Sequence, residues 1–446
     1  MRTAKFHFRG SRIRRADGDE VPRSKGADAG GSWKRRADSS GPHEKARAPH
    51  PAAQPLEPQA ETDLGTSPPT TQPFDRLALA AAIIQKADKD HPADMVLREK
   101  LRLAGRLLRS QTGEVSRAVF AYYRWYGWLD HRRPVTAQLK RALDLDSGYA
   151  ERPESFSDDK LLERCLPEWT ASQVEISVDW IRAIQSEPRL WLRAKRGQGK
   201  LLARKLHHSK ACGLPDAVLF FGQEDSFRSP EFQAGEFEIQ GIASQAVGLL
   251  CDPKPDETWW DACAGEGGKT LHLSDLMGNK GLIWASDRAS WRLTMLKRRA
   301  ARAKVFNYRA VPWDGGERPP TKTQFDGVLV DAPCSGIGTW QKNPHARWTS
   351  GAQDVQELSE AQTRLLCNAA VGVKPGGRLI YAACTLARPE TIGVVAAFEK
   401  RCPQFQRQMV QNPLELGALP CDLLYLWPHK TGGNGMCIVA WTRKVE

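Results

Sequence analysis

Alternating strand and helix patterns in the second half of the chain constrain its fold most. After about residue 256, six apolar segments have the character of strands, and helical patterns lie between most of them. Their sequences are TWWDAC, LIWASD, FNYRAV, GVLVDAP, RLIYAAC and MCIVAWTR. This β-α-β alternation is typical of a doubly wound, mostly parallel sheet. We therefore predict an α/β domain over residues 251–446, with ligands at the carboxyl ends of its strands.

The first half of the chain divides by composition. Residues 1–73 are rich in Arg, Ala, Gly, Pro and Ser, so we expect a disordered basic tail. Residues 74–186 carry helical periodicity and predict an N-terminal helical domain. Residues 187–250 are expected to form a small mixed α+β subdomain ahead of the catalytic core.

One helix in the helical domain is unusually aromatic. Ser116 is a suitable N-cap for a helix through AVFAYYRWYGWL. Its aromatic residues are Phe120, Tyr123, Trp125 and Trp128. Because aromatic side chains dominate core energetics, we expect them to be core residues rather than an RNA-stacking face.

Charge and cysteine content narrow the class of protein. The chain has 65 Lys and Arg against 52 Asp and Glu, a net charge of +13, which favours a polyanionic partner such as nucleic acid. Its ten cysteines include no CxxC pair, which argues against a structural zinc site and a disulfide framework. We expect no metal, no membrane association, a cytoplasmic location, and a monomer without an obligate protein partner.

Two cysteines stand at the ends of predicted strands. Cys334 follows GVLVDAP and Cys384 follows RLIYAA, while a glycine-rich loop, DACAGEGGKT, occupies residues 261–270. Cysteines placed behind a nucleotide-type loop suggest covalent chemistry on a substrate held beside a cofactor.

The glycine-rich loop fits neither of two common nucleotide motifs. Cys263 occupies the position where a Walker A loop has its first glycine, and the loop lacks GxGxxG spacing. Asp287 ends the next strand, where an acid typically accepts hydrogen bonds from ribose hydroxyls, although it could instead cap a helix. Asp314 follows the third strand and could bind adenine or ribose. These features predict an adenosyl ligand without a polyphosphate, S-adenosylmethionine.

Four segments carry a resemblance to a known family. DACAGEGGKT resembles its cofactor loop, DxCAAPGGKT, and DAPCSGIGT resembles its DAPCSGxGxxR/W motif. The segment from QTRLL to ARPET and the segment GEFEIQGIASQ also resemble family motifs. Over roughly residues 187–446 the chain resembles the RNA (cytosine-5)-methyltransferases of the RsmB/Sun type. The resemblance implies a Rossmann-like class I methyltransferase fold. It also implies an RNA-binding role for the helical domain at residues 74–186, because some bacterial members carry such a domain in this position.

The resemblance also implies roles for individual residues. It implies that Cys384 attacks carbon 6 of cytosine and that Cys334 assists release. In related DNA enzymes the Pro-Cys cysteine attacks, so Cys334 is the alternative nucleophile. Asp331 would hydrogen-bond the base, and Lys269 would orient Asp331 or lower a thiol pKa. The expected cofactor-binding residues are Cys263, Ala264, Gly265, Glu266, Gly267, Gly268, Lys269, Asp287, Arg292, Asp314 and Asp331.

The expected substrate is structured RNA, with ribosomal RNA favoured over tRNA. The acid-free stretches 193–210 and 288–309 are candidate phosphate-binding surfaces. Some residues depart from the family motifs: Gly265-Glu266 replaces Ala-Pro, and Ala383 and Thr385 flank Cys384 in place of Thr and Ser. These departures motivate an alternative, a catalytically weak RNA-binding assembly factor. Methylation of a protein or small molecule is a third hypothesis.

Overall fold

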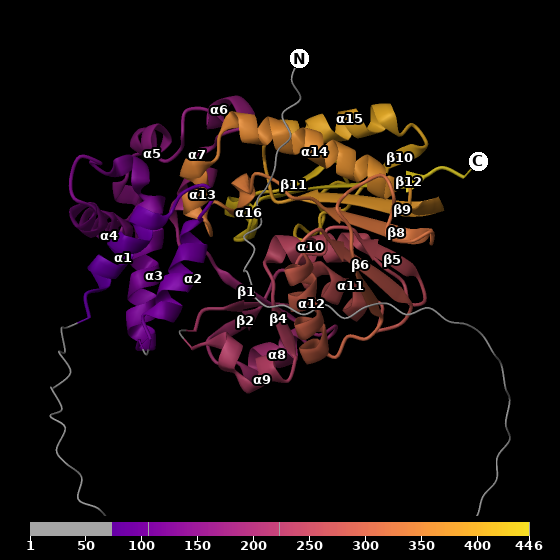
Figure 1. The fold of residues 1–446 in the computed structure, drawn as a ribbon, viewed down its shortest axis with the longest axis horizontal. Helices are drawn as coiled ribbons and strands as arrows, with labels where there is room; N and C mark the ends of the chain where they lie inside the picture. The colour runs from indigo at the N-terminus through magenta and orange to yellow at the C-terminus, as the bar shows by residue number, and fades with distance from the viewer. Residues whose placement is uncertain (1–73, 106, 223, 446) are drawn as a thin grey trace, which may run out of the picture. The chain divides into compact units, whose positions relative to one another are not determined.

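The computed structural model describes residues 74–105, 107–222 and 224–445, and the predicted basic tail, 1–73, lies outside this range. In chain order the described residues form a group of helices, a small antiparallel sheet and a large sheet flanked by helices (Figure 1).

The N-terminal helices pack around a shared apolar core. They are α1 (Arg76–Lys86), α2 (Ala93–Leu103), α3 (Arg109–Arg124), α4 (Val135–Glu151), α5 (Asp158–Arg164), α6 (Thr170–Gln173) and α7 (Val178–Gln185). Asp75 caps α1 by accepting hydrogen bonds from the backbone of Leu77 and Ala78. The predicted helix start at Ser116 is wrong, because the Ser116 hydroxyl donates to the Thr112 carbonyl inside α3. A serine that bonds back one turn is compatible with a helix interior.

A small antiparallel sheet follows the helices. Its strands are β1 (Leu190–Ala194), β2 (Ser209–Ala211), β3 (Ala217–Phe220) and β4 (Phe237–Ile239), in the order β2-β3-β1-β4. The helices α8 (Gly199–Lys205) and α9 (Pro230–Gln233) lie between these strands in the chain. The central strand β1 places Arg193 in the interior, where it pairs with Asp275 at 2.8 Å.

The large sheet confirms the predicted α/β class. Its strands run in the order β10-β12-β9-β8-β5-β6-β7, with β11 beside β12. The parallel strands are β5 (Thr258–Asp261), β6 (Leu282–Asp287), β7 (Tyr308–Pro312), β8 (Phe325–Asp331) and β9 (Val373–Ala383). The strand β12 (Met436–Arg443) is antiparallel to β9, β10 (Phe405–Gln408) and β11 (Leu424–Leu426). All six predicted strands are present, whereas the short strands β10 and β11 were not predicted.

The strand register brings the candidate residues to one edge of the sheet. Asp261 pairs with Leu329 on β8, and Asp287 pairs with Pro312 on β7. The chain winds outward from β5 to β7 and then returns to β8 on the other side of β5. Such a reversal of strand order opens a crevice at the carboxyl ends of the strands.

Helices cover both faces of the large sheet (Figure 1). α14 (Ala352–Ala370) and α15 (Val394–Arg401) lie on one face, and α10 (Ile242–Cys251), α11 (Gly268–Leu276) and α12 (Ser290–Ala303) lie on the other. Side chains alternate across the sheet, so Trp260 packs under α14 and α15 while neighbouring Trp259 packs under α10 and α11.

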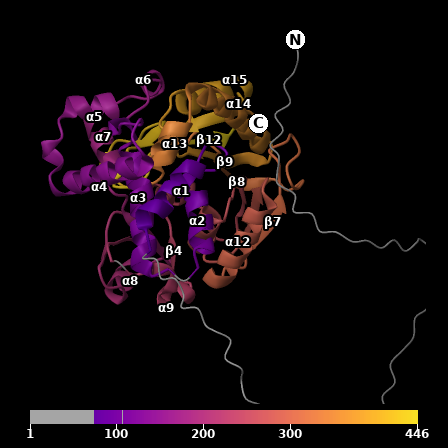
Figure 2. The same cartoon turned by 60° about the vertical axis from the view of Figure 1, so that its left-hand side comes forward.

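The helical segment and the large-sheet segment share one hydrophobic cluster. Trp180 of α7 stacks on Trp340, with ring centroids 6.1 Å apart. The Trp348 indole of α13 (Pro344–Thr349) donates to the Tyr123 carbonyl of α3 at 2.7 Å. Figure 2 shows α13 beside α3. Side chains from both sides of residue 186, the predicted end of the helical domain, therefore pack against each other.

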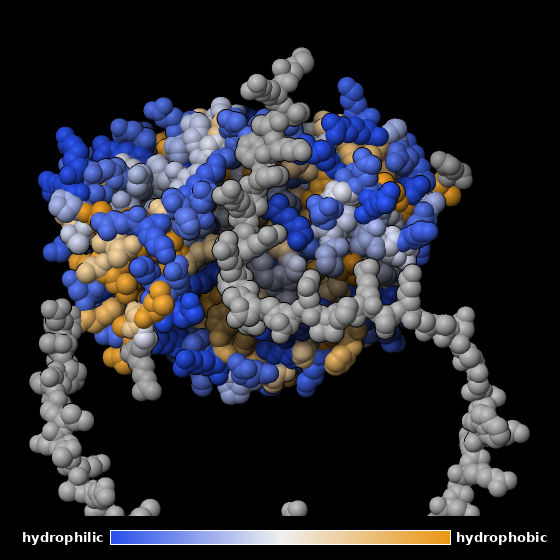
Figure 3. Space-filling model, viewed as in Figure 1, coloured by the Kyte–Doolittle hydropathy of each residue, from blue (hydrophilic) through white to orange (hydrophobic). Residues whose placement is uncertain are grey.

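Part of the helical segment also has an apolar surface. Met95, Leu103 and Leu108 are each more than half exposed, and Figure 3 shows apolar residues gathered over the left-hand helices. Across residues 74–445, apart from the two undescribed positions, none of the helices has the length and apolar character needed to cross a bilayer.

Candidate active site

The glycine-rich loop turns sharply between β5 and α11. Gly267 has φ +87°, and a Cβ at this position would lie 2.6 Å from Leu296 Cγ. Inside the turn, Thr270 Oγ1 donates to Asp261 Oδ2 at 2.7 Å. Burial raises the pKa of Asp261 to about 7. The loop therefore depends on glycine at a left-handed, crowded position.

Asp287 connects the glycine-rich loop to the start of α12. Its carboxylate accepts from the Gly265 amide at 3.1 Å and from the Ala289 amide at 2.8 Å. Arg292 lies 3.6 Å from the same carboxylate. Asp287 was expected either to bind the ribose of a ligand or to cap a helix. The two roles are compatible, because the side chain fixes the loop and also borders the cavity beside it.

A cavity of about 340 Å³ lies at this edge of the sheet. Five of the predicted cofactor residues line it: Cys263, Asp287, Arg292, Asp314 and Asp331. The others, Ala264, Gly265, Glu266, Gly267, Gly268 and Lys269, form the turn and the first residues of α11 beyond the cavity lining. Sequence reasoning missed the apolar wall of Trp313, Pro333 and Leu365 and the amide of Asn368.

The two predicted cysteines lie in direct contact. Cys334 Sγ and Cys384 Sγ are 3.1 Å apart, although 50 residues separate them in the chain. The hydrogen bond to Cys384 and burial raise the pKa of Cys334 well above its usual value. Cys334 is therefore harder to ionise than an ordinary cysteine.

Lys269 and Asp331 form an ion pair beside the cysteines. Lys269 Nζ lies 2.5 Å from Asp331 Oδ2. Burial by itself lowers the pKa of Lys269, but the Asp331 carboxylate outweighs burial and the net shift is upward. Lys269 is therefore a buried cation at neutral pH, and it orients the Asp331 carboxylate.

A buried glutamate joins the two cysteine loops, and sequence reasoning did not single it out. Glu390 accepts from the Ser335 amide at 2.8 Å and from the Ser335 and Thr385 hydroxyls at 2.5 and 2.8 Å. Gln362 also donates to it at 2.8 Å. Burial raises the pKa of Glu390 despite these hydrogen bonds. Since Ser335 follows Cys334 and Thr385 follows Cys384, this carboxylate fixes both loops.

Four basic residues of the two stretches are used inside the fold. Arg299 pairs with Glu238 at 2.9 Å, and Arg302 pairs with the same carboxylate. Lys195 Nζ donates to the Ala303 carbonyl at 2.6 Å, and Arg193 is buried. The expectation that these stretches form a phosphate-binding surface is therefore wrong for these residues, because intramolecular partners neutralise or bury them.

Comparison with known proteins places this geometry in a family. A family model described as 16S rRNA methyltransferase RsmB/F matches residues 248–442. A probable ribosomal RNA small subunit methyltransferase B from Bacillus subtilis is 36% identical over 48% of this chain and 49% of its own length. The small subunit methyltransferase B of Klebsiella pneumoniae is 30% identical over 64% of this chain and 67% of its own. A 28S rRNA (cytosine-C(5))-methyltransferase from Mus musculus is 35% identical over 39% of this chain and 22% of its own.

A solved structure of a methyltransferase homolog shares this fold. A methyltransferase homolog protein from Pyrococcus horikoshii superposes with a TM-score of 0.55 at 24% identity, over 64% of this chain and 98% of that one. The chain spans about half the length of the first curated relatives it matches. From the matched model, the extent of the Klebsiella pneumoniae alignment and the shared fold, the chain belongs to the RsmB/F family of 16S rRNA methyltransferases.

Proposed function

We propose that this protein transfers a methyl group from S-adenosylmethionine to carbon 5 of a cytosine in ribosomal RNA. The observation that carries the proposal is the Cys334–Cys384 pair, with its sulfurs 3.1 Å apart at the carboxyl ends of two adjacent parallel strands. Methylation of a protein or a small molecule would leave two facing thiols without a role.

The cavity beside the cysteines is suited to an adenosyl cofactor. Carboxylates at the ends of two strands, Asp287 and Asp314, can accept hydrogen bonds from ribose or adenine. Trp313, Pro333 and Leu365 supply an apolar wall. When bound, S-adenosylmethionine supplies the methyl group.

Cys384 is the proposed nucleophile. Carbon 5 of cytosine becomes nucleophilic only after a thiolate adds to carbon 6. The raised pKa of Cys334 disfavours Cys334 as the attacking thiolate. The Sγ–C6 bond forms, carbon 5 takes the methyl group, and loss of the C5 proton then breaks the Sγ–C6 bond. Cys334, in contact with the leaving sulfur, assists this last step.

Asp331 and Lys269 are the proposed partners of the base. The Asp331 carboxylate can accept a hydrogen bond from the cytosine amino group, and the adjacent Lys269 ammonium offsets negative charge as carbon 6 is attacked. The RNA substrate class is supported by the names of the relatives, which act on ribosomal RNA.

Trapping of the covalent intermediate tests the proposal. Cys334→Ala incubated with total cellular RNA and S-adenosylmethionine should accumulate a protein–RNA adduct that survives denaturation, whereas Cys384→Ala should not. Cys421→Ala, a half-buried cysteine outside the pair, should behave as wild type. An adduct in Cys384→Ala alone would make Cys334 the nucleophile.

A second measurement separates the enzyme from an assembly factor. Tritium from labelled S-adenosylmethionine should enter RNA with the wild-type protein. Cofactor binding without transfer to any RNA would contradict the proposed enzyme and favour an RNA-binding assembly factor that retains the methyltransferase fold.

A further inference from the structure

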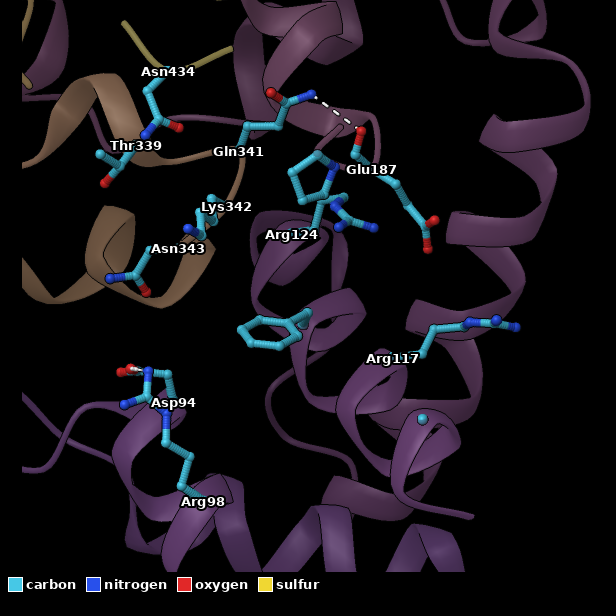
Figure 4. Close-up of a pocket in the computed structure, with 13 residues that line it drawn as sticks. Asp94, Arg98, Arg117, Arg124, Glu187, Thr339, Gln341, Lys342, Asn343 and Asn434 are labelled. Carbon is cyan, nitrogen blue, oxygen red and sulfur yellow. Dashed lines mark hydrogen bonds and ion pairs between the residues drawn. The ribbon is translucent and has the colours of Figure 1, made fainter. Parts of the chain in front are cut away.

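A second cavity lies between the helical segment and the loop that follows Cys334 (Figure 4). Its volume is about 670 Å³, which is within the range of small-ligand sites. One wall comes from α2 and α3, and the other from residues 339–343. The lining residues that carry the argument are Arg117, Phe120, Glu187, Thr339, Lys342 and Asn434.

Backbone hydrogen bonds connect residues beside the cavity to the loop that carries Cys384. Thr339 is five residues beyond Cys334. The Gly338 amide donates to the Cys384 carbonyl at 3.1 Å, and the Gly435 amide donates to the Gly338 carbonyl at 2.7 Å. Hydrogen bonds thus tie the backbone next to Thr339 and Asn434 to the loop of Cys384.

One face of α3 borders the cavity instead of packing into the core. Arg117, Phe120 and Arg124 are spaced three and four residues apart and share this face, and Gly113 extends it with open space beside its Cα. Phe120 is only half buried, and its ring pairs with no other aromatic ring of the described residues. The prediction that Phe120 is a core residue is therefore only partly correct, whereas Tyr123 and Trp125 are buried.

The charges of the cavity favour an anionic ligand on one side. Arg117 and Lys342 are exposed, and neither forms an ion pair with any residue that the structure describes. The other two arginines of the lining are paired: Arg98 forms an ion pair with Asp94, and Arg124 forms one with Asp146. Figure 4 shows Lys342 on one side of the cavity and the Glu187 carboxylate on the other, so phosphates are expected on the Lys342 side.

Asn434 supplies a polar group able to contact a base. Its side-chain amide makes no hydrogen bond to the rest of the described chain, and it borders the cavity next to Thr339 (Figure 4). A free amide offers one acceptor and two donors, which suits the edge of a nucleobase.

We propose that this cavity binds a nucleotide of single-stranded RNA that flanks the target cytosine. Its base stacks on Phe120, its edge meets Asn434, and its phosphate lies near Lys342. This inference rests on the proposed function only in taking RNA as the ligand. The nucleotide next to the target cytosine would then be recognised by α2 and α3 on one side and by the loop that follows Cys334 on the other.

Binding and crosslinking of a defined probe test the inference. The probe is a fluorescent 12-nucleotide oligocytidylate, with 5-iodocytidine at single positions for photocrosslinking. Phe120→Ala should raise its Kd about 10-fold, because a base stacked on an aromatic ring contributes about that much, while Phe120→Trp should restore binding. Phe306→Ala is the matched control, since Phe306 is 76% exposed, does not line this cavity and precedes the edge strand β7.

Two further readouts locate the contact. Ultraviolet light should crosslink the probe to the tryptic peptide 118–124, which contains Phe120. Lys342→Gln should reduce the slope of log Kd against log salt by about 0.7, as expected for one lost phosphate contact to a single strand. Unchanged binding by Phe120→Ala, or crosslinks confined to other peptides, would overturn the inference.

The outcomes are distinct from those that test the proposed function. A wild-type protein that methylates RNA while Phe120→Ala binds the probe normally refutes the RNA site alone. A protein that crosslinks through peptide 118–124 but transfers no methyl group retains the RNA site and loses the proposed activity. Binding of an acidic peptide at the cavity, with no crosslink to RNA, would also refute the inference.

Discussion

At the scale of single residues, Glu390 is the group whose removal should most clearly separate catalysis from binding. Glu390→Gln keeps the size of the side chain but replaces one acceptor oxygen with an amide donor, so it can no longer accept all four hydrogen bonds from Ser335, Thr385 and Gln362. The two cysteine loops then lose their common anchor. We expect kcat to fall about 10- to 100-fold, the range seen when supporting residues of a site are lost, with little change in KM for RNA.

The kcat and KM values of this variant decide whether Glu390 positions the cysteines. Glu360→Gln, on the exposed surface of α14, is the matched control and should leave both constants unchanged. A rise in KM with kcat intact would mean that Glu390 acts in binding. Glu390→Asp, which retains both acceptor oxygens on a shorter chain, should recover part of the rate.

Asp261 should make stability depend on pH. Its carboxyl pKa is raised from 3.8 to about 7 by burial, so the unfolded state loses its proton first as pH rises. The group therefore destabilises the cofactor-free fold by about 1.4 kcal/mol per pH unit between these two values. Asp261→Asn cannot ionise, so its free energy of unfolding should increase relative to wild type from pH 4 to pH 7. Denaturant titrations of both proteins, with Asp256→Asn as an exposed control, would contradict this if the difference stayed constant.

At the scale of elements, the glycine-rich turn should tolerate substitution at one glycine and not at another. At Gly267, φ is +87° and a Cβ would meet Leu296 at 2.6 Å, so Gly267→Ala should lower the free energy of unfolding by about 2–4 kcal/mol. Gly265 has φ +55° but open space around it, so Gly265→Ala should cost only about 1 kcal/mol. Thermal unfolding of the two variants measures this difference, and equal costs would show that crowding at Leu296 is relieved by local movement.

The parallel strands were predictable because each carries its own signal. Segments such as LIWASD combine apolar and β-branched residues with an acid at the end, and their register then brings Asp287 and Asp331 to one edge. The start of α3 was not predictable in this way. Serine is a favourable N-cap residue and leucine an unfavourable one, yet α3 begins after Leu108, and Ser116 lies inside the helix. The role of Glu390 was hidden as well, because its partners come from loops 55 and 5 residues away and meet it only in the folded chain.

At the scale of the whole molecule, the basic stretches show why charge alone could not locate an RNA surface. Arg193, Arg299 and Arg302 stand in acid-free runs, yet each is paired with a carboxylate from a distant element. Other cations of the same runs, such as Lys297 and Arg298, are exposed and form no ion pair with any described residue, and the same holds for Lys342, which lies outside the runs. The acid-free runs therefore do not distinguish the cations held inside the fold from those left exposed.

Arg347 connects the helical segment to the large-sheet segment through the interior. It is fully buried on α13 and donates to the Cys165 carbonyl at 3.0 Å, the Ile184 carbonyl at 3.1 Å and the Gln185 amide oxygen at 2.7 Å. Burial lowers its pKa to about 10, so it stays charged at neutral pH. Three acceptors of the helical segment thus depend on a single side chain from the other segment.

Removal of this side chain should loosen the two segments together. Arg347→Ala leaves the three acceptors unpaired and opens a void, so the free energy of unfolding should fall by about 3–5 kcal/mol. Arg228→Ala, at an arginine with an 89% exposed side chain, should change it by about 0.5 kcal/mol or less. Denaturant unfolding followed by tryptophan fluorescence measures both changes. A loss below about 1 kcal/mol for Arg347→Ala would mean that water replaces the guanidinium, and that the aromatic contacts of Trp180 and Trp340 hold the segments together by themselves.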